Sequence, residues 1–510
     1  MRPVRFLAGE RWTSKANDRL RMTQEEFESI DFESKEWIET LQRYINIHRV
    51  DQLPRLQELK RYYMGNNNIK YRPPKTDEFA ADNRIASDFA RYITIFEQGY
   101  MLGKPIQYKN ENEQLQEQIN EFSVQNNEEH HNVNIKTDLS IYGRAYELET
   151  VDRQDGALAV RLTKLDTEQT FVVYDDSYQD NSLFAVNYYD MDYGSGGKKT
   201  FVIVYTSNAI IRYVDDSNDE QRGLHYDSAE EHHFNGVPIT EFSNNEERTG
   251  AFEPVLDSID AYDLSQSELA NFQQDSVDAM LVITGNPYTG ADDNDFNEDG
   301  TLNPNGKLAV SRAFKQAKML ILDGNPIDDG VKPDAKYLVK AYDTTGAEKY
   351  KDRLVRDILR FTFTPDSSDE HFGGQQTGEA LKYKLMASDN LRSAQERVFK
   401  KGLMRRLRLA ANIWQIRGNE ATAYNSINRT NVIFTPNVPK NDNELVARAQ
   451  SLYGMVSDMT LYEVLQQVTG INADTELERI KEEENESRQV ESRFPSLVAE
   501  NGDEDESEKA

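Results

Sequence analysis

Residues 345–378 have the sequence TGAEKYKDRLVRDILRFTFTPDSSDEHFGGQQTG, and residues 379–418 continue as EALKYKLMASDNLRSAQERVFKKGLMRRLRLAANIWQIRG. The first stretch places apolar residues three and four positions apart, which predicts an amphipathic helix over 345–362 that Pro365 ends. The second stretch keeps this spacing for about forty residues, interrupted only at Gly402, and predicts a long second helix. The loop between them, 365–378, is rich in glycine, serine and acidic residues and should project into solvent or into a cavity.

The second predicted helix is too long for a small monomeric domain. A helix of about forty residues spans about 60 Å, which exceeds the diameter of a compact domain of this size. A ring of subunits accommodates such a helix more naturally than a single globule does. The two helices and their loop therefore indicate an assembly protein, although they define no chemistry.

Composition excludes several classes of protein. The chain has 510 residues, a formal net charge of −30 and no cysteine. This length allows roughly two to four domains without stabilising metals or disulfides, and the lack of cysteine suits a reducing cytoplasm. So acidic a protein should be repelled by phosphate backbones, which disfavours tight DNA binding but not the passage of DNA. The apolar runs are too short to span a membrane, so we expect neither membrane association nor export.

Hydrophobic patterning over the rest of the chain predicts an α+β fold. Helical spacing predicts helices near 34–48, 54–65, 83–99, 115–122, 253–280 and 441–470. Alternating apolar residues predict strands near 145–151, 157–164, 170–175, 183–190, 199–205, 208–214 and 428–438. The helices at 253–280 and 345–362 should pair as a stalk, and the insertion between them carries short strands predicted at 280–284, 307–310, 318–322 and 336–341. The acidic tail, 471–510, is expected to be disordered.

Catalytic motifs are absent from the sequence. We find no nucleophile elbow, phosphate loop or histidine–carboxylate metal motif. The string GYMLGKPI at 99–106 is not a phosphate loop, because proline rather than serine or threonine follows its lysine. We interpret His48 as a half-buried structural histidine and the adjacent His130 and His131 as part of a solvated turn, since neighbouring helix positions face different directions. We therefore expect no enzymatic activity and no cofactor.

One acidic loop partly matches a cation-binding pattern. Asp295, Asn297, Asp299 and Gly300 fit the first half of a calcium-binding loop. The twelfth position, however, is Gly306 instead of the glutamate that would bind in a bidentate manner, and no helix is predicted on either side. We interpret the loop as acidic and solvated, with weak cation binding as the alternative.

The long second helix carries a cluster of basic residues. Arg397, Lys401, Arg405 and Arg408 are spaced so that all four lie on one helix face. Such a face could contact phosphate or an acidic neighbouring subunit. In a chain with this net charge we favour the neighbouring subunit.

Several short strings resemble the portal proteins of tailed bacteriophages with long non-contractile tails. The resemblance covers most of residues 35–470 and is specific in aggregate rather than in any single motif. Its strings are YYMG at 62–65, NRI at 83–85, GYMLGKPI at 99–106, YGRAYEL at 142–148, IDAYD at 259–263, PDSSD at 365–369 and TGEALKY at 377–383.

This resemblance implies a portal-like α+β fold made of named parts. The parts are an N-terminal arm at 1–29, a wing at 30–252 and 379–440, stem helices at 253–280 and 343–364, a small α/β clip at 281–342, a tunnel loop at 365–378, a helical crown at 441–470 and the acidic tail. The tunnel loop would include Pro365, Asp366, Ser368, Asp369, Phe372, Gly373, Gly374, Thr377 and Gly378.

The resemblance also implies a function and partners. The protein would form a dodecameric ring at one capsid vertex, assembled in the host cytoplasm, through which double-stranded DNA is packaged and ejected. Its partners would be the terminase large subunit, head–tail connector proteins, the scaffold and the major capsid protein. Two alternatives remain from the residues alone: a non-portal oligomeric scaffold or adaptor, and an acidic hydrolase with an unrecognised carboxylate site.

Overall fold

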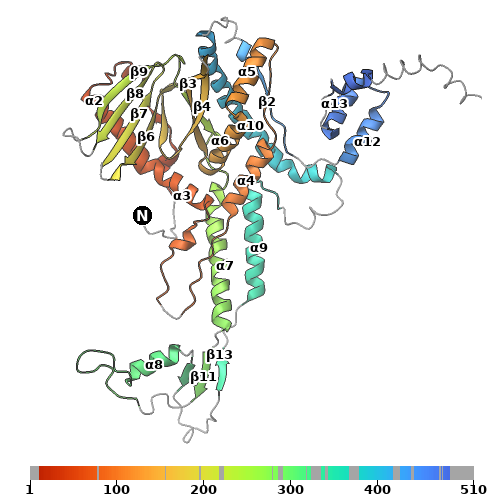
Figure 1. Ribbon diagram of the computed structural model, residues 1–510. Coiled ribbons are helices and arrows are strands. Elements are labelled where there is room, and N and C mark those ends of the chain that lie inside the picture. Colours follow the sequence, from red (N-terminus) through yellow and green to blue (C-terminus); the bar gives the residue numbers. More distant parts are fainter. Residues whose placement is uncertain are drawn as a thin grey trace, which may run out of the picture. The chain divides into compact units, whose positions relative to one another are not determined.

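The computed structural model describes residues 11–76, 80–154, 157–194, 197–216, 223–277, 280–284, 291–316, 319–322, 335–338, 343–366, 378–416, 426–437, 442–469, 473 and 475–482. The chain forms two compact units. One comprises Met1–Asp366 with Ala387–Asn437, and the other comprises Ser367–Met386 with Val438–Ala510. The fold is of the mixed α+β type, with long helices and a six-stranded sheet (Figure 1).

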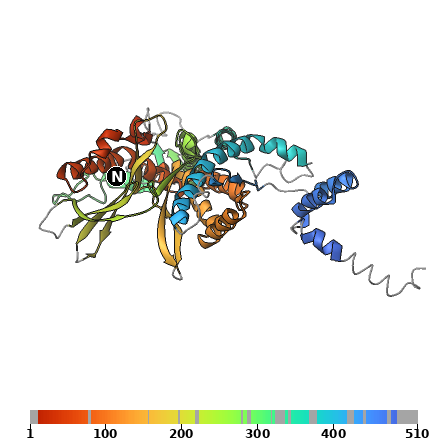
Figure 2. The ribbon, with the colours of Figure 1, turned by 90° about the horizontal axis from the view of Figure 1, so that it is seen from above.

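The six-stranded sheet confirms four of the predicted strands, which are β5 to β8. Its order is β1-β5-β6-β7-β8-β9, antiparallel except where β1 runs parallel to β5. Helix α2 (Lys35–Ile47) packs against one face of this sheet (Figure 2). There the indole N–H of Trp37 donates to the Tyr213 hydroxyl at 2.7 Å. His48 follows this helix and is fully buried rather than half-buried, with Nδ1 2.7 Å from the Tyr188 hydroxyl. The strand bounds are β1 Leu20–Arg21, β5 Thr170–Tyr174, β6 Ser182–Asp192, β7 Lys198–Tyr205, β8 Ala209–Asp216 and β9 His225–Glu231.

A three-stranded sheet, β10-β3-β4, forms the second layer of this unit. It contains β3 (Arg144–Gln154), β4 (Ala157–Leu165) and β10 (Ile239–Ser243), and helices α5 (Glu113–Gln125), α6 (Glu128–Tyr142) and α10 (Gly378–Ile416) share its apolar core. The solvated turn expected at His130 and His131 is wrong, because both residues lie within α6 and His131 is buried. A short sheet pairs β2 (Gln107–Lys109) with β14 (Asn431–Ile433), so the strand predicted over 428–438 is shorter than expected.

The helix predicted over 83–99 begins later than expected. Helix α4 spans Phe89–Leu102, and residues 81–88 are neither helix nor strand. Their backbone N–H groups are instead bound by side chains of α7 (Leu256–Val277), as described below, which prevents them from joining a helix. Helix α3 (Leu53–Tyr63) ends as predicted before Gly65, whose φ is +67°. The remaining short elements of this unit are η1 Ser14–Asn17, α1 Gln24–Glu28, η2 His48–Gln52, η3 Asn68–Tyr71 and η5 Glu253–Val255.

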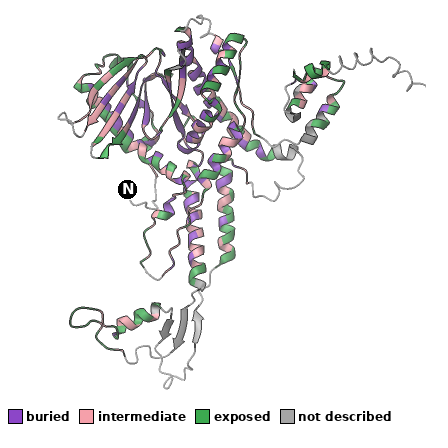
Figure 3. Cartoon of the chain, viewed as in Figure 1, coloured by how far each residue is buried: buried purple, intermediate pink, exposed green. Residues whose placement is uncertain are grey.

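Helices α7 and α9 (Thr344–Phe361) lie side by side, in agreement with the predicted pairing (Figure 1). Lys351 of α9 donates to Gln266 of α7 at 2.8 Å, and Figure 3 shows α9 buried toward α7 and exposed on its other side. Helix α9 ends at Phe361, because Phe363 has a φ of +54° and Thr364 donates back to the Leu359 carbonyl. Pro365 therefore lies beyond the end of the helix and does not terminate it.

The insertion between α7 and α9 contains a small sheet and one helix. Strand β11 (Met280–Thr284) pairs in parallel with β12 (Met319–Leu322) and antiparallel with β13 (Ala335–Leu338). The strand predicted at 307–310 is wrong, because this stretch begins helix α8 (Lys307–Gln316). Asp295 Oδ1 accepts the Leu308 N–H at 2.7 Å and so satisfies a donor in the first turn of α8.

The second unit contains the helical segment predicted at 441–470. It forms α12 (Asp442–Leu452) and α13 (Asp458–Thr469), with Ala449 and Leu461 buried. The prediction of a disordered tail does not hold for residues 475–482, which are helical. Within this helix, Arg479 and Glu476 are three residues apart, and the distance between their charged groups is 3.8 Å. Residues 483–510 lie outside the described part of the chain.

Candidate functional site

Helix α7 is held along its length by a ladder of hydrogen bonds. Four of its side chains, at intervals of four residues, accept backbone N–H groups from an extended segment at 81–87, in which every second residue donates. The acidic and amide-rich sequence of α7 is thus used to dock another part of the chain. The four pairs are Ala81 with Asp275 (3.2 Å), Asn83 with Asn271 (2.6 Å), Ile85 with Ser267 (3.0 Å) and Ser87 with Asp263 (2.8 Å).

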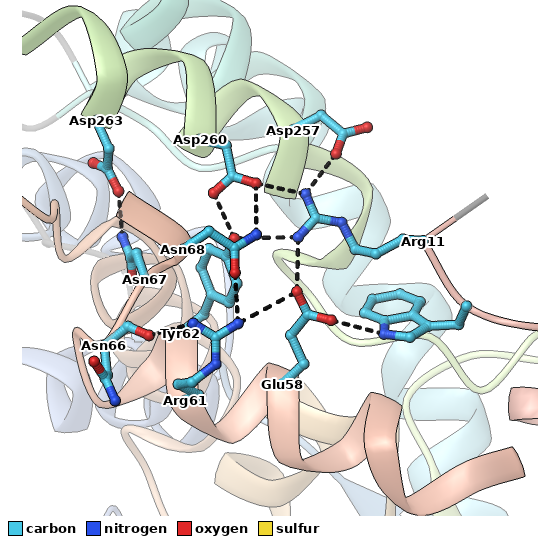
Figure 4. A network of polar contacts seen from close by, with 11 residues as sticks. Arg11, Glu58, Arg61, Tyr62, Asn66, Asn67, Asn68, Asp257, Asp260 and Asp263 are labelled. Carbon is cyan, nitrogen blue, oxygen red and sulfur yellow. Dashed lines mark hydrogen bonds and ion pairs between the residues drawn. The ribbon is translucent and has the colours of Figure 1, made fainter. Parts of the chain in front are cut away.

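The first turns of α7 are anchored by a single arginine, Arg11 (Figure 4). Its Nη2 donates to Asp257 at 2.5 Å and to Asp260 at 2.7 Å, both on α7. Its Nη1 donates to Glu58 at 2.9 Å and to the Tyr62 hydroxyl at 3.1 Å, both on α3. Arg11 therefore neutralises carboxylates on two helices at once. Burial alone would lower the pKa of Arg11, but Tyr62 and the two aspartates outweigh it and raise this pKa overall.

Polar neighbours complete this anchorage. Trp12 donates to Glu58 at 2.9 Å, and Asn68 donates to Asp260 at 3.0 Å. Asn67 donates to Asp263 at 2.7 Å (Figure 4). Burial raises the pKa of Asp263 to about 6, in spite of its hydrogen bonds from Ser87 and Asn67, and the nearby Asp260 adds to the rise.

Helix α10 is anchored by a fully buried arginine, Arg406. Its Nε and Nη2 donate to the two carboxylate oxygens of Glu147 at 2.8 and 2.5 Å, and its Nη1 donates to Glu128 at 2.6 Å and Asn132 at 2.9 Å. His131 Nε2 lies 2.6 Å from Glu147. Burial alone would raise the pKa of Glu147, but the charge of Arg406, assisted by His131, lowers it to about 2.

Two more contacts lie on the same face of α10. Gln395 accepts from Lys136 of α6 at 3.1 Å, and the same ammonium group binds Glu97 and Asn244 at 2.9 Å each. Gly402, expected only to interrupt the helix, lies against Phe242 of β10, where a Cβ atom would stand 2.4 Å from the ring. Glycine is thus required here for the close approach of helix and sheet.

The predicted basic face does not present all four of its residues in the same way. Arg397 and Lys401 are exposed. Arg405 donates instead to the backbone carbonyls of Val237 at 2.8 Å and Ile239 at 3.1 Å. Arg408 donates to the Asn428 side chain at 2.9 Å. Two of the four cations are therefore engaged within the chain.

The predicted tunnel loop lies mostly outside the described residues. Residues 367–377 are not described, Pro365 and Asp366 follow α9, and Gly378 is the first residue of α10. The Tyr92 hydroxyl donates to the Pro365 carbonyl at 3.2 Å.

The candidate cation loop uses its carboxylates internally. Asp299 Oδ1 accepts from the Thr301 N–H at 3.0 Å and from its hydroxyl at 2.6 Å, while Asp295 accepts from Leu308. Asn297 donates its side-chain amide to Thr301. Within the described ranges, no group of three or more histidine, aspartate or glutamate side chains could hold a metal ion.

The sequence interpretation missed the anchoring roles of Arg11 and Arg406. Arg11 lies 246 residues from Asp257, and Arg406 lies 259 residues from Glu147. Periodicity within one element carries no information on pairs so distant. The local hint of the Arg406 anchorage was the polar composition of α6, which supplies Glu128 and His131.

Comparison with known proteins identifies the class to which this arrangement belongs. A family model described as phage portal protein, SPP1 Gp6-like, matches residues 42–490, and the chain belongs to this family. Among curated proteins, the portal protein of Bacillus phage SPP1 is 25% identical over 469 residues, which cover 87% of this chain and 86% of the relative. None of the helices in the described ranges is long and apolar enough to cross a membrane.

Family membership confirms the predicted class of function. The chain functions as a phage portal protein, a structural component of the virion at a capsid vertex and not an enzyme. The hydrolase and the non-portal scaffold considered above are therefore set aside.

Proposed function

We propose that this portal protein assembles into a dodecameric ring around a channel for double-stranded DNA. The ring binds the terminase large subunit during packaging and head–tail connector proteins afterwards, and the scaffold and major capsid protein during head assembly. Support comes from the family match over residues 42–490, since a portal acts as an oligomer through which the genome passes.

The proposal assigns a role to each segment. Residues 253–280 and 343–364 form the stem, 281–342 the clip that contacts terminase and connector, 365–378 the tunnel loop, 30–252 and 379–440 the wing, and 441–470 the crown. The observation that carries this assignment is the pair α7 and α9, joined by a small sheet and anchored at α7 by Arg11 and by the 81–87 ladder. The hydrogen bonds of the ladder hold α7 along its length, and α9 packs against this supported helix.

Electron microscopy of the purified protein tests the ring directly. We expect rings with a central channel, and a monomer or an open filament would contradict the proposal. A second experiment tests the clip assignment with a variant that lacks residues 285–335. This variant should stay in solution and lose binding to terminase and connector in a pull-down experiment, and unchanged binding would remove the clip assignment.

The tunnel loop requires a test of its own. Gly373 and Gly374 leave the backbone permissive between two long helices, so valine at both positions should stiffen the loop without preventing ring formation. The measurement is the length of DNA protected from nuclease per procapsid. We expect it to fall relative to procapsids with the unchanged ring, and full-length packaging would reduce the loop to a linker.

A further inference from the structure

Helix α9 carries a straight row of four cations that no role described so far uses. Lys349, Arg353, Arg356 and Arg360 follow one another at steps of four, three and four residues, which places them on one side of the helix. All four are exposed, and the Arg353 side chain is 76% accessible. The row is about 16 Å long at the helical rise of about 1.5 Å per residue.

The row points away from α7. The opposite side of α9 carries Lys351, which donates to Gln266 of α7, and Ile358, which is fully buried in the core cluster that includes Ile259 of α7. Residues 351 and 358 stand about half a turn from the row, given about 100° per residue. The four cations therefore lie on the side of α9 that its own partner helix leaves uncovered.

Carboxylates in the described part of the chain engage the row only weakly. Arg353 Nε lies 3.5 Å from Asp357 on the same helix, and Arg356 Nε donates to the Asp352 backbone carbonyl at 3.3 Å. No hydrogen bond or ion pair joins the side chain of Lys349 or Arg360 to any other described residue. Exposed contacts within one helix contribute little energy, so the charges of the row remain available.

The acids of α7 do not offer the row a partner on a second copy either. Asp257 and Asp260 bind Arg11, and Asp263 binds Asn67 and the Ser87 N–H. The other two acids of the helix bind the segment beside it, Glu268 through Arg72 and Asp275 through the Ala81 N–H. All five acids of α7 thus have a partner inside their own chain, and among them Asp257 keeps a largely accessible side chain (95%).

We propose that this row, Lys349, Arg353, Arg356 and Arg360, binds the phosphate backbone of duplex DNA. The proposal rests on the proposed channel function and adds the residues that touch the passing duplex. Duplex DNA presents a charge about every 1.7 Å along its axis, so a row about 16 Å long meets phosphates in any register. An acidic protein surface would have to match the spacing of the row, whereas DNA does not. Three of the four residues are arginines, whose planar forks suit phosphate oxygens.

Such a contact would be weak and independent of sequence. Four cations in a chain of net charge −30 attract phosphate over a short range while the rest of the protein repels it. A moving duplex could therefore exchange one contact for the next without being trapped. We still expect duplex DNA to bind weakly at physiological salt. The salt-dependent part of this binding should come from the row on α9.

The first experiment compares two double variants with the same change in charge. Arg353→Gln with Arg356→Gln neutralises the row on α9, and Arg397→Gln with Lys401→Gln neutralises the exposed cations of α10. Binding of a duplex of unrelated sequence is measured by fluorescence anisotropy from 25 to 200 mM salt. The slope of log K against log salt should fall in magnitude by about one for each phosphate that the protein no longer neutralises, and affinity at low salt should fall about tenfold or more, in the α9 variant only.

Each other result overturns the proposal. An unchanged slope in the α9 variant, or an equal loss in both variants, would show that the row is not the DNA contact. Loss of rings in the α9 variant alone, seen by electron microscopy, would show that the row binds an acidic surface of a second copy. If the unchanged protein formed no rings, the proposed channel would fail, but the slope comparison would still test the row on whatever oligomer exists.

A second experiment leaves all four cations in place. Because the chain contains no cysteine, one can be introduced at Asp352, beside the row, or at the exposed Ala394 of α10 as a matched control. Each is labelled with an iron chelate that cleaves nearby DNA. The proposal expects salt-sensitive cleavage from position 352 that exceeds cleavage from position 394 several-fold, and equal or reversed yields would overturn it.

Discussion

Helices α9 and α10 both carry basic residues at helical spacing, but they orient them differently. In α10, Arg406 is fully buried against Glu147 and Glu128, and Arg405 donates to backbone carbonyls beside β10. In α9, the row represented by Arg353 and Arg356 is exposed. Helix α10 therefore uses arginine to fix itself in the fold, whereas α9 keeps its charges for an external partner.

The cause of this difference lies in the neighbouring elements. Strand β3 and helix α6 offer α10 two buried carboxylates and an amide at hydrogen-bonding distance. Helix α7 offers α9 an apolar surface and one glutamine, because its acids are already bound to other segments. The spacing of charged residues along a helix thus shows that they share one face. Whether that face is buried or exposed depends on the partners that the neighbouring elements offer.

The largest expected effect comes from Arg406→Met. This change leaves Glu147 and Glu128 buried without their cation, so the free energy of unfolding should fall by about 3–5 kcal/mol. Urea denaturation followed by circular dichroism measures it. Arg408→Met, two residues further along and bound only to Asn428, is the control and should cost less than about 1 kcal/mol. Equal losses would contradict the assigned difference between the two arginines.

Arg11→Gln should have the next largest effect. It leaves Asp257, Asp260 and Glu58 without their shared cation, and loss of charged hydrogen bonds of this kind costs about 2–3 kcal/mol. Limited proteolysis within 66–88 should also accelerate, because α7 and α3 would no longer be held together. Wild-type stability would show that Arg11 is dispensable for this anchorage.

The two anchorages should respond to pH in opposite directions. The pKa of Asp263 is about 6 in the folded chain against 3.8 in model peptides, so the folded state holds this proton more tightly. Its contribution to stability is therefore present at low pH and is lost as pH rises from about 4 to about 6. Asp263→Asn should remove this decline, because an amide does not titrate, although it keeps only one of the two oxygens that accept from Asn67 and Ser87. Urea midpoints across this range measure it, and an unchanged pH profile would exclude the effect.

Glu147 provides the contrasting case. Its pKa is about 2 in the folded chain against 4.5 in model peptides. The ionised Glu147 therefore stabilises the folded state above about pH 4.5, and this contribution to the free energy of unfolding is lost as the pH falls toward 2. Glu147→Gln should therefore flatten the acid limb of the stability profile and leave the decline between pH 4 and 6 unaltered. A change in that upper window would show that the two sites are coupled.

The smallest effect is expected for the exposed row. Arg353→Gln with Arg356→Gln should change the free energy of unfolding by less than about 0.5 kcal/mol, because these side chains make no buried contact. Thermal and urea unfolding of the variant check this value. A larger loss would mean that the row supports the fold, and it would remove the contrast with α10.

Sequence patterns predicted those elements whose apolar residues follow one period. Strands β5 to β8 and helices α5, α9 and α10 agree with their predicted ranges within a few residues. Helix α6 was missed because its buried side chains include Glu128, His131 and Lys136, whose partners compensate the cost of burial. A search for apolar periodicity cannot detect such a helix.

The candidate site was less predictable than the fold. The class of protein followed from several short strings read together, whereas the anchoring residues Arg11 and Arg406 depend on contacts between distant parts of the chain. Residues 83–88 were predicted as helix because their own sequence does not reveal that α7 will bind their N–H groups. These features become visible only when the elements are placed together.

The ladder between residues 81–87 and α7 sets a rule for how this part of the chain can change length. Two residues of extended chain advance about 6.6 Å and four residues of helix advance about 6.0 Å, so one N–H group meets one side chain at each step. Deleting a single residue from the extended segment turns its donors to the opposite side, and deleting one from α7 rotates its acceptors by about 100°. The shortest alteration that preserves the pairing removes two residues from the segment and four from the helix together. Related chains should therefore differ in length in both regions together, by two residues in the extended segment for every four residues in α7.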